Sequence, residues 1–287
     1  MNEWMLEDKK VKIGIVGAGV MGRGVAQRFS TYGYEVILVD IAQDILKVAN
    51  KEISRNLKAQ SMFQENINVD EIMSRITFTL DYEQLADVDV LIENVPEIVE
   101  VKEKVYKELA HICKDECIYM VNTSCIPITL IARFVKYPEK VIGVHFMNPV
   151  QMKNFAEVIK GVTTLEETIV FTQELLEKVD IEIEVVNDSA GFVSNRISHL
   201  YMNEAAFLIY EGVATAKQID NIFKKAFNHK MGPLETADLI GIDTVLDSLH
   251  ILYNQYEDSK YRACPLLKRM VESEKTGRKK GEGFYKY

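Results

Sequence analysis

The sequence predicts an α/β protein with a doubly wound, mostly parallel sheet, followed by an all-helical C-terminal domain. Two observations support this fold class. In the first two thirds of the 287 residues, short apolar runs alternate with longer amphipathic stretches, an order typical of right-handed βαβ units. After residue 187, by contrast, no segment has the composition of a strand. We therefore expect two domains, residues 1–187 and 188–287.

Five near-continuous apolar runs mark the expected parallel strands. Strands covered by helices on both faces have such runs in place of alternating polar and apolar residues. Residues 155–161 and 181–186 are expected to form the final strands, on either side of a helix over residues 164–179. The five runs are residues 11–19, 35–40, 88–95, 117–124 and 141–146, and the helices expected between them cover residues 20–32, 42–63, 97–112 and 127–136.

The C-terminal domain carries helix signals throughout. Asp188 and Ser189 are residues of the type that caps helices, so we expect a helix to begin near Ala190. Pro233 suits the first turn of a later helix. The segment 196–212 is apolar on more than one side, which predicts burial against its own domain and against a partner subunit.

Charge and composition exclude several classes of function. The 43 acidic and 34 basic side chains give a net charge of -9, so the chain lacks the basic footprint of a nucleic-acid-binding protein. The N-terminal residues contain no apolar signal segment, and no apolar run approaches the ~20 residues of a spanning helix. We expect a cytoplasmic protein with neither nucleic acid nor a membrane as a partner.

The four cysteines are expected to be buried thiols. None belongs to a Cys-x-x-Cys pair, and the short cluster of His111, Cys113 and Cys117 has no second pair of ligands. We therefore expect no metal site.

A glycine-rich turn follows the first expected strand. Residues 17–22 read GAGVMG, which matches the GxGxxG pattern in its required place between a strand and a helix. Gly17 permits the tight turn, Gly19 lets backbone N–H groups approach a pyrophosphate, and Gly22 lets helix and strand pack closely. Val20 and Met21 begin the helix, whose N-terminal dipole favours phosphate. The turn therefore predicts a dinucleotide site.

An acidic residue at the end of the second expected strand selects among dinucleotides. Asp40 follows Gly19 at about the 20-residue spacing of the ribose-binding acid. A carboxylate there suits the ribose diol of NAD and repels the 2′-phosphate of NADP, and residues 41–43 contain no arginine to compensate. We expect NAD, with a flavin dinucleotide as the chemical alternative because its ADP half fits the same turn.

His145 and Glu157 are the candidate acid–base pair. An imidazole can remove the hydroxyl proton as a carbinol carbon gives up hydride, and a carboxylate can orient that imidazole and stabilise its cation. His145 ends one expected strand and Glu157 lies in the next. If these strands are neighbours, the two side chains meet at one edge of the sheet.

Ser124 and Asn122 lie at the C-terminal end of the expected strand 117–124, at the edge where ligands bind in such sheets. Ser124, His145 and Glu157 could also form a hydrolase triad, but the serine does not lie in a GxSxG turn. We expect it to hydrogen-bond a substrate oxygen, and we expect the adjacent Cys125 to be a small buried residue.

The chain resembles the L-3-hydroxyacyl-CoA dehydrogenase family, and most closely its short bacterial 3-hydroxybutyryl-CoA dehydrogenase type, almost from end to end. The resemblance implies a Rossmann domain that binds NAD, a helical C-terminal domain that forms a homodimer, and interconversion of 3-hydroxyacyl and 3-oxoacyl thioesters. The motifs that carry it are GIVGAGVMGRGVAQ, IENVPEIVEVK, VNTSCIPIT, VIGVHFMNPV, FAEVIKG, GFVSNRI, MGPLETADLIGID and GRKKGEGFYKY.

The same resemblance implies roles for individual residues. His145 corresponds to the general base, Glu157 to the carboxylate that orients it, and Ser124 to the serine that contacts the substrate oxygen. Asn195 corresponds to the asparagine that completes the site. Cofactor contacts are implied for Asp40, Glu97, Lys102 and Asn122, and Asn148 falls at a position that lines the substrate pocket.

Three basic residues of the long helix, Lys51, Arg55 and Lys58, are spaced to share one face. The resemblance directs this region at the phosphates of CoA. An acidic acyl carrier protein would favour the same cluster, and an exposed helix face without any ligand also explains it.

One loop departs from the family pattern. Gln151 replaces a proline, and Lys153 and Asn154 replace a methionine and a lysine. A more polar loop beside the acyl group makes a polar or branched substrate, or one carried on an acyl carrier protein, the alternative to a simple acyl-CoA. A protein that binds NAD without catalysis is the alternative from another class, but all four candidate catalytic residues are present.

Overall fold

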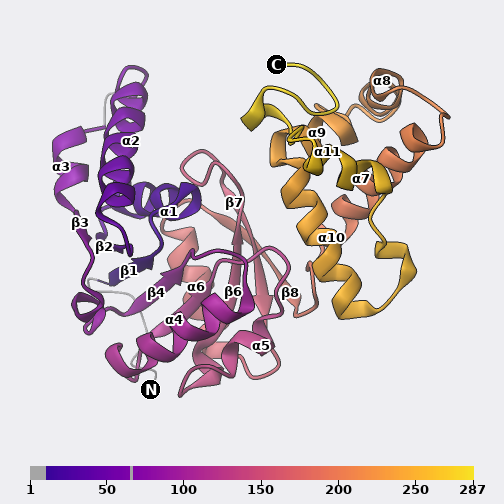
Figure 1. Ribbon diagram of the computed structural model, residues 1–287. Coiled ribbons are helices and arrows are strands. Elements are labelled where there is room, and N and C mark those ends of the chain that lie inside the picture. The colour runs from indigo at the N-terminus through magenta and orange to yellow at the C-terminus, as the bar shows by residue number, and fades with distance from the viewer. Residues whose placement is uncertain (1–10, 65–66) are drawn as a thin grey trace. The chain divides into compact units, whose positions relative to one another are not determined.

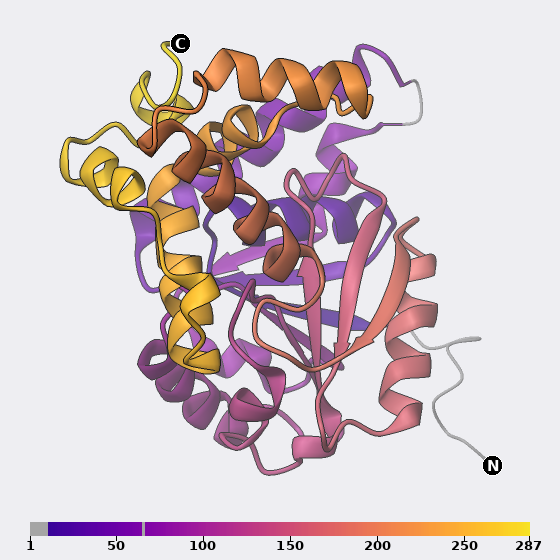
Figure 2. The ribbon, with the colours of Figure 1, turned by 90° about the vertical axis from the view of Figure 1, so that its right-hand side faces the viewer.

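The computed structural model describes residues 11–64 and 67–287. The chain divides into two compact units, Met1–Ser189 and Ala190–Tyr287. The first is an α/β unit built on one sheet, and the second consists of helices and their connections (Figure 1, Figure 2). This confirms the predicted fold class.

Eight strands of the first unit form one sheet in the order β3-β2-β1-β4-β5-β6-β7-β8. Neighbouring strands are parallel except β6 and β7, which are antiparallel. The strand order reverses between β1 and β4, and dinucleotides bind at such a switch point. The strands are β1 Lys12–Val16, β2 Glu35–Val39, β3 Ile76–Thr79, β4 Val90–Glu93, β5 Ile118–Val121, β6 Val141–Phe146, β7 Phe155–Lys160 and β8 Glu182–Asn187.

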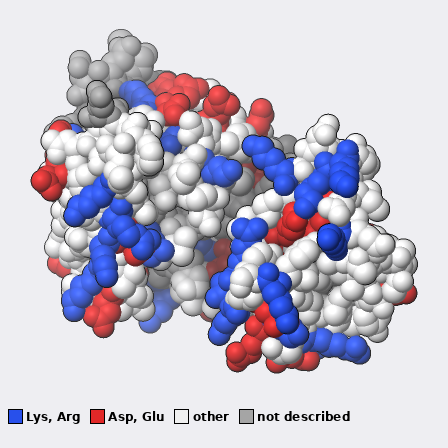
Figure 3. Space-filling model, turned by 90° about the horizontal axis from the view of Figure 1, so that it is seen from above, with Lys and Arg blue, Asp and Glu red and all other residues white. Residues whose placement is uncertain are grey.

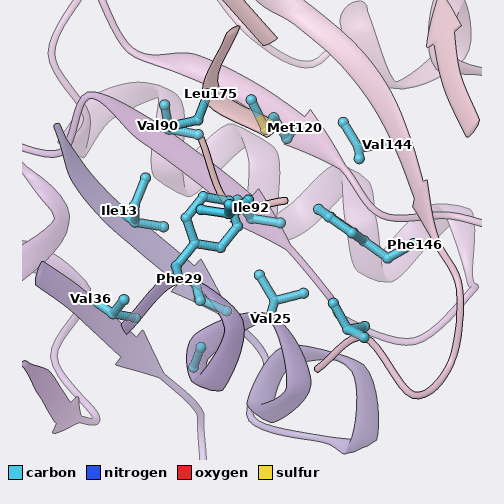
Figure 4. Packing of buried hydrophobic residues seen from close by; sticks show 14 of the residues in the cluster. Ile13, Val25, Phe29, Val36, Val90, Ile92, Met120, Val144, Phe146 and Leu175 are labelled. Carbon is cyan, nitrogen blue, oxygen red and sulfur yellow. The ribbon is translucent and has the colours of Figure 1, made fainter. Parts of the chain in front are cut away.

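One face of this sheet is covered by α1 (Val20–Thr31), α2 (Gln43–Ser61) and α6 (Glu166–Glu177). Val25 and Phe29 of α1 are fully buried there and lie against the apolar side chains of β1 and β4 (Figure 4). Burial of each such side chain contributes about 1.5–3 kcal/mol. This packing fixes the start of α1, and with it the glycine turn, against the sheet.

The opposite face carries α4 (Val99–Ile112) and α5 (Ile128–Ala132). The Tyr106 ring of α4 lies 6.0 Å from the Tyr119 ring of β5. The Ile128 side chain of α5 lies directly over Gly143 of β6. The predicted helix over 127–136 is therefore real but shorter than expected.

Residues 69–79 hold a helix and a strand that the sequence did not predict, α3 (Val69–Ser74) and β3. β3 pairs only with β2, at the edge of the sheet, and Ile76 is its one fully buried residue. An edge strand of four residues with little burial has no continuous apolar run, which is the feature on which the strand predictions depended.

The second unit contains five helices, and Pro233 occupies the first turn of α9 as predicted. The helix expected near Ala190 begins instead at Ser194, and Asp188 does not cap it: its carboxylate binds the first turn of α5, which lies in the same unit as Asp188. The predicted cap was wrong because the Asp188 carboxylate accepts the N–H groups of Ile128 and Thr129, which lie far from it in the sequence. The helices are α7 Ser194–Tyr210, α8 Ala216–Ala226, α9 Pro233–Ile240, α10 Ile242–Tyr256 and α11 Pro265–Glu272.

Two buried aspartates fix the C-terminal segment of the second unit. Asp238 accepts hydrogen bonds from the backbone N–H groups of Phe284 and Tyr285, both at 2.9 Å, and from the Tyr287 hydroxyl at 3.0 Å. Asp220 accepts two N–H groups in the first turn of α9 and the Tyr285 hydroxyl at 2.7 Å. The last residues of the chain are therefore held from within the unit.

Candidate active site

The glycine turn between β1 and α1 has the geometry that a dinucleotide requires. Gly17 has φ +93°, and a Cβ there would lie 2.7 Å from the backbone oxygen of Asn94. A Cβ on Gly22 would lie 1.8 Å from the carbonyl oxygen of Gly17, so α1 could not pack as closely. A Cβ on Gly19 would meet nothing within 4 Å. Gly17 and Gly22 thus serve the fold, and the space at Gly19 fits a bound pyrophosphate.

Asp40 follows β2 and joins that strand end to the glycine turn. Its carboxylate accepts the Ala18 N–H at 2.8 Å and the Ala42 N–H at 3.2 Å. The two start residues of α1 lie beside the turn, with Val20 half exposed and Met21 partly buried. An ionised carboxylate retains further acceptor capacity, so Asp40 can also bind a ribose diol.

The His145–Glu157 pair lies across the antiparallel strands β6 and β7. The two residues are directly opposite in the register, and Nδ1 of His145 lies 3.3 Å from Oε2 of Glu157. Their side chains are 12% and 5% exposed. The prediction that these strands are neighbours is confirmed, and the loop of residues 147–154 joins them.

The strand register brings Ser124 to the same edge as His145. β5 and β6 are parallel neighbours with Val121 level with Gly143, so Ser124 and His145 both lie beyond that level. Alternate residues of a strand point to opposite faces. Because Val144 and Phe146 point into the core beside α1 and α6, His145 points to the face that carries α5.

The turn that contains Ser124 is organised by Glu97, from the connection between β4 and α4. One carboxylate oxygen, Oε1, accepts the backbone N–H groups of Ser124 at 2.9 Å, Cys125 at 2.8 Å and Ile126 at 3.3 Å. The same atom accepts the hydroxyl of Thr123 at 2.5 Å. A residue predicted to contact the cofactor is therefore the anchor of the serine turn.

A buried ion pair lies behind Glu97. The Lys102 ammonium is 2.8 and 2.7 Å from the two carboxylate oxygens of Glu93, and 3.8 Å from Oε2 of Glu97. The side chains of Lys102 and Glu93 are 0% exposed. Burial raises the pKa of the Glu93 carboxyl, and the Lys102 ammonium opposes that rise. Glu93 is not recognisable as a site residue from the sequence, because its only signal is an acid at the end of an apolar run.

Asn122 connects the two loops that contain these groups. Its side-chain amide donates to Oδ1 of Asn94 at 2.7 Å, and its backbone carbonyl oxygen accepts from the Lys102 ammonium at 3.4 Å. Asn94 directly follows β4 next to Gly17, and Asn122 directly follows β5 next to the serine turn. The glycine turn and the serine turn are thus joined by one hydrogen-bonded network.

Comparison with known proteins assigns this arrangement to a family. Residues 12–189 match the family model for the NAD binding domain of 3-hydroxyacyl-CoA dehydrogenase. Residues 191–287 match the model for its C-terminal domain. The chain belongs to the 3-hydroxyacyl-CoA dehydrogenase family. The predicted resemblance is confirmed.

Individual members of the 3-hydroxyacyl-CoA dehydrogenase family are similar over nearly the whole chain. A probable 3-hydroxybutyryl-CoA dehydrogenase of Deinococcus radiodurans is 41% identical over 278 residues, which cover 96% of this chain and 100% of that protein. The 3-hydroxybutyryl-CoA dehydrogenase of Bradyrhizobium diazoefficiens is 40% identical over 280 residues, covering 96% and 95%. The crystal structure of (S)-3-hydroxybutyryl-CoA dehydrogenase from Ralstonia eutropha aligns with a TM-score of 0.91 at 34% identity, covering 97% and 99%.

The first unit is therefore the NAD-binding domain of a 3-hydroxyacyl-CoA dehydrogenase, which confirms NAD as the predicted cofactor. The glycine turn and Asp40 have the geometry described above for it. The four cysteines of the chain are buried free thiols, as expected. Within the described ranges 11–64 and 67–287, no helix is long and apolar enough to cross a membrane.

The remaining predicted residues are distributed over three elements. Asn148 is exposed in the loop between β6 and β7, and Asn195 lies on α7 in the second unit. Lys51, Arg55 and Lys58 are all exposed on α2, and Arg55 pairs with Glu52 at 2.5 Å. On the face drawn in Figure 3, basic side chains form small groups beside acidic ones.

The polar loop of this 3-hydroxyacyl-CoA dehydrogenase contacts its own unit. The Asn154 side chain accepts from the buried Arg28 guanidinium at 3.0 Å and donates to Asp180 at 2.7 Å. The Gln151 amide oxygen lies over Gly24 of α1. Two of the three replaced residues are therefore accounted for by contacts with α1 and with the turn before β8.

Proposed function

We propose that the protein is an NAD-dependent dehydrogenase that interconverts 3-hydroxyacyl and 3-oxoacyl thioesters of CoA, with 3-hydroxybutyryl-CoA and acetoacetyl-CoA as the candidate pair. The observation that carries the proposal is the His145–Glu157 pair at the sheet edge to which Ser124 also belongs. A relative at 40% identity has the name 3-hydroxybutyryl-CoA dehydrogenase. Membership of this family favours the redox interpretation over the hydrolase triad and over an inactive NAD-binding protein.

His145 takes the hydroxyl proton when the substrate is oxidised. The Glu157 carboxylate accepts the Nδ1–H of the ring, and this tautomer leaves Nε2 to receive the proton. The carboxylate then stabilises the imidazolium, which returns the proton to the oxygen in the reverse direction. A base positioned in this way contributes about 10²–10⁴-fold to the rate.

NAD, when bound, accepts the hydride in oxidation and donates it in reduction. Gly19 leaves room for its pyrophosphate, and Asp40 binds its ribose diol. Ser124 donates a hydrogen bond to the reacting oxygen of the substrate, and the role that the family resemblance implies for Asn195 stays a prediction. Glu97, Lys102 and Asn122 support both groups through the loops that they join.

We assign the phosphates of CoA to the exposed basic face of α2, which consists of Lys51, Arg55 and Lys58. Asn148 is assigned to the acyl end of the substrate. An acyl carrier protein remains the alternative carrier, since its acidic surface would suit the same face. The contacts of Gln151 and Asn154 with α1 weaken the case for a polar acyl group.

We also propose a homodimer formed by the second unit. Large apolar side chains are exposed on or directly after its helices, among them Ile197 of α7, Ile222 of α8 and Phe227 after α8, at 64, 57 and 62%. Monomeric proteins seldom expose extended apolar patches. Light scattering of the purified chain would test this, and a monomeric mass would contradict it.

The decisive experiment is NADH oxidation by the purified protein with acetoacetyl-CoA, run beside the same acyl group on an acyl carrier protein and beside NADPH. We expect fast turnover with NADH and the CoA ester, and at least about tenfold less with NADPH, because the Asp40 carboxylate repels the 2′-phosphate. Turnover confined to the carrier-bound substrate would show that the substrate is a thioester of an acyl carrier protein and not of CoA. Tight NADH binding without turnover of any thioester would refute the proposed activity.

A further inference from the structure

The segment that carries Ser124 is held at a second point, by a carboxylate from far along the chain. Oδ1 of Asp188 accepts the Ile128 N–H at 3.0 Å, and Oδ2 accepts the Thr129 N–H at 2.7 Å. These N–H groups begin α5 and have no partner within that helix. Asp188 directly follows β8, so one ionised carboxylate joins the end of β8 to the helix that follows the serine turn.

The same helix start is held against the strands of the acid–base pair. A Cβ on Gly143 would lie 2.6 Å from the Ile128 side chain, so this glycine lets α5 lie directly on β6, two residues before His145. Oγ1 of Thr129 accepts the Val162 N–H at 3.0 Å, just beyond the end of β7, which carries Glu157. The position of α5 is thereby set relative to both catalytic strands.

We infer that Asp188 is a positioning residue for Ser124. Glu97 holds the turn at one end of the segment and Asp188 holds α5 at the other, so the serine hydroxyl keeps one place relative to His145. The inference rests on the proposed function, because that function gives Ser124 the contact with the reacting oxygen. A misplacement of about 1 Å at a reacting group can cost about 10²-fold in rate.

A carboxylate that only caps a helix would stabilise the fold without affecting the chemistry. The second unit contains a matched example, since Asp220 accepts the N–H groups of Leu234 and Glu235 at 3.0 and 2.9 Å in the first turn of α9. Asp188→Asn and Asp220→Asn make the same chemical change at the start of two helices. An amide has one acceptor oxygen, so each variant leaves one N–H facing an NH₂ group.

The test is the turnover of both variants with acetoacetyl-CoA, together with the primary isotope effect from NADH deuterated at the transferred position. In Asp188→Asn we expect kcat to fall by about 10- to 10²-fold and the isotope effect to rise, because hydride transfer becomes more rate-limiting, while NADH affinity is unchanged. Asp220→Asn should lower the melting temperature and leave the isotope effect as it is. Wild-type kinetics in Asp188→Asn would overturn the inference.

A double-mutant cycle with Ser124→Ala decides whether Asp188 acts through the serine. In the Ser124→Ala background, we expect Asp188→Asn to lower kcat by less than about threefold, because the effects of coupled residues are non-additive. An equal loss in both backgrounds would show that Asp188 acts elsewhere and would overturn the inference. Should Asp188→Asn fail to bind NADH, the cycle is run with Asp188→Glu, which keeps the charge and shifts the carboxylate.

Amide hydrogen exchange separates this inference from the proposed function. If the wild-type protein oxidises no NADH with any thioester, the function fails, but the restraint can still be measured. In Asp188→Asn the N–H groups of Ser124 and Cys125 should exchange faster, as well as those of Ile128 and Thr129. Faster exchange confined to Ile128 and Thr129 would overturn the inference.

Discussion

The two units both bury carboxylates, but among the described residues only the first unit pairs one of them with a buried ammonium. Glu93 accepts the Val95 N–H and the Tyr106 hydroxyl and is also paired with the Lys102 ammonium, beside the carboxylate that holds the turn of Ser124. In the second, Asp220 and Asp238 bind backbone N–H groups and tyrosine hydroxyls. A buried ion pair adds little net stability, because desolvation offsets the attraction of the charges. We therefore interpret the first set as serving the site and the second as serving the fold.

The largest effect is expected at His145, the proposed base. In His145→Gln we expect turnover to fall by at least about 10²-fold, because the variant cannot take up the substrate proton. NADH affinity and the melting temperature should be nearly unchanged. His111→Gln, at an exposed position of α4, is the control and should keep wild-type kinetics. Steady-state kinetics measure both, and a rate within a fewfold of wild type would contradict the role of His145.

Removing the ammonium tests whether the first unit tolerates its buried acid. Lys102→Met should lower the free energy of unfolding by about 3–5 kcal/mol near neutral pH, because it leaves the Glu93 charge buried without its counter-ion. Burial already raises the pKa of Glu93. A folded pKa above the unfolded value means that the folded state binds more protons, so stability is retained at low pH and lost as pH rises through the folded pKa.

Denaturation of Lys102→Met at pH 5 and pH 8 measures this effect, and the deficit should be larger at pH 8. Lys107→Met is the control, since Lys107 pairs with Glu103 on the exposed side of the same helix. An exposed pair contributes about 0–1 kcal/mol. A deficit in Lys102→Met that is independent of pH would mean that Glu93 does not take up a proton.

In the second unit, we expect a loss of stability without a loss of activity. Asp238→Asn should lower the free energy of unfolding by about 1–3 kcal/mol, because it weakens the hydrogen bonds from Phe284, Tyr285 and Tyr287. Turnover per folded molecule should be unchanged. Thermal unfolding and kinetics of the same sample check both statements. A large loss of turnover at full stability would break the comparison between the units.

The smallest effect is expected at one tyrosine hydroxyl. Tyr285→Phe removes the hydrogen bond to Asp220 and should cost about 1 kcal/mol. Burial, and then the hydrogen bond to Asp220, raises the pKa of Tyr285 well above its ordinary value of 10.0. The folded state therefore keeps a proton that the unfolded state loses, so this contribution is complete below pH 10 and declines as pH rises further.

Unfolding curves at pH 8 and pH 11 test this statement. The difference in the free energy of unfolding between wild type and Tyr285→Phe should be smaller at pH 11. Tyr253→Phe, at a partly exposed position of α10, is the control. If this difference in the free energy of unfolding were the same at both pH values, the Tyr285 hydroxyl would not be a buried donor.

The part of the site that the sequence predicted depends on local patterns. The glycine turn is recognisable because the strand, the turn and the helix are consecutive. The His145–Glu157 pair could be predicted because two strands joined by a short loop have few ways to pair, and a side-chain period of 2 then fixes which residues meet. Both features are complete within about 25 residues of chain.

The part that could not be predicted depends on docking between distant segments. Asp188 looked like the cap of the helix that follows it, yet it binds residues that precede it by 60 and 59 positions. Nothing in the local sequence pairs Glu93 with Lys102, and the docking of α4 on the sheet buries both side chains. Neither contact leaves a periodic signal in the sequence.

The convergence of three backbone N–H groups on Glu97 affects how the protein should respond to anions. Successive N–H groups at such a turn form a concave site that attracts phosphate, sulfate or carboxylate ions. Here the chain fills that site with its own carboxylate. Small anions in a buffer should therefore inhibit poorly at the serine turn, and an acidic inhibitor aimed there would have to displace Glu97. Ligands that bind through neutral hydrogen-bonding groups are the better starting point for chemical probes of this enzyme.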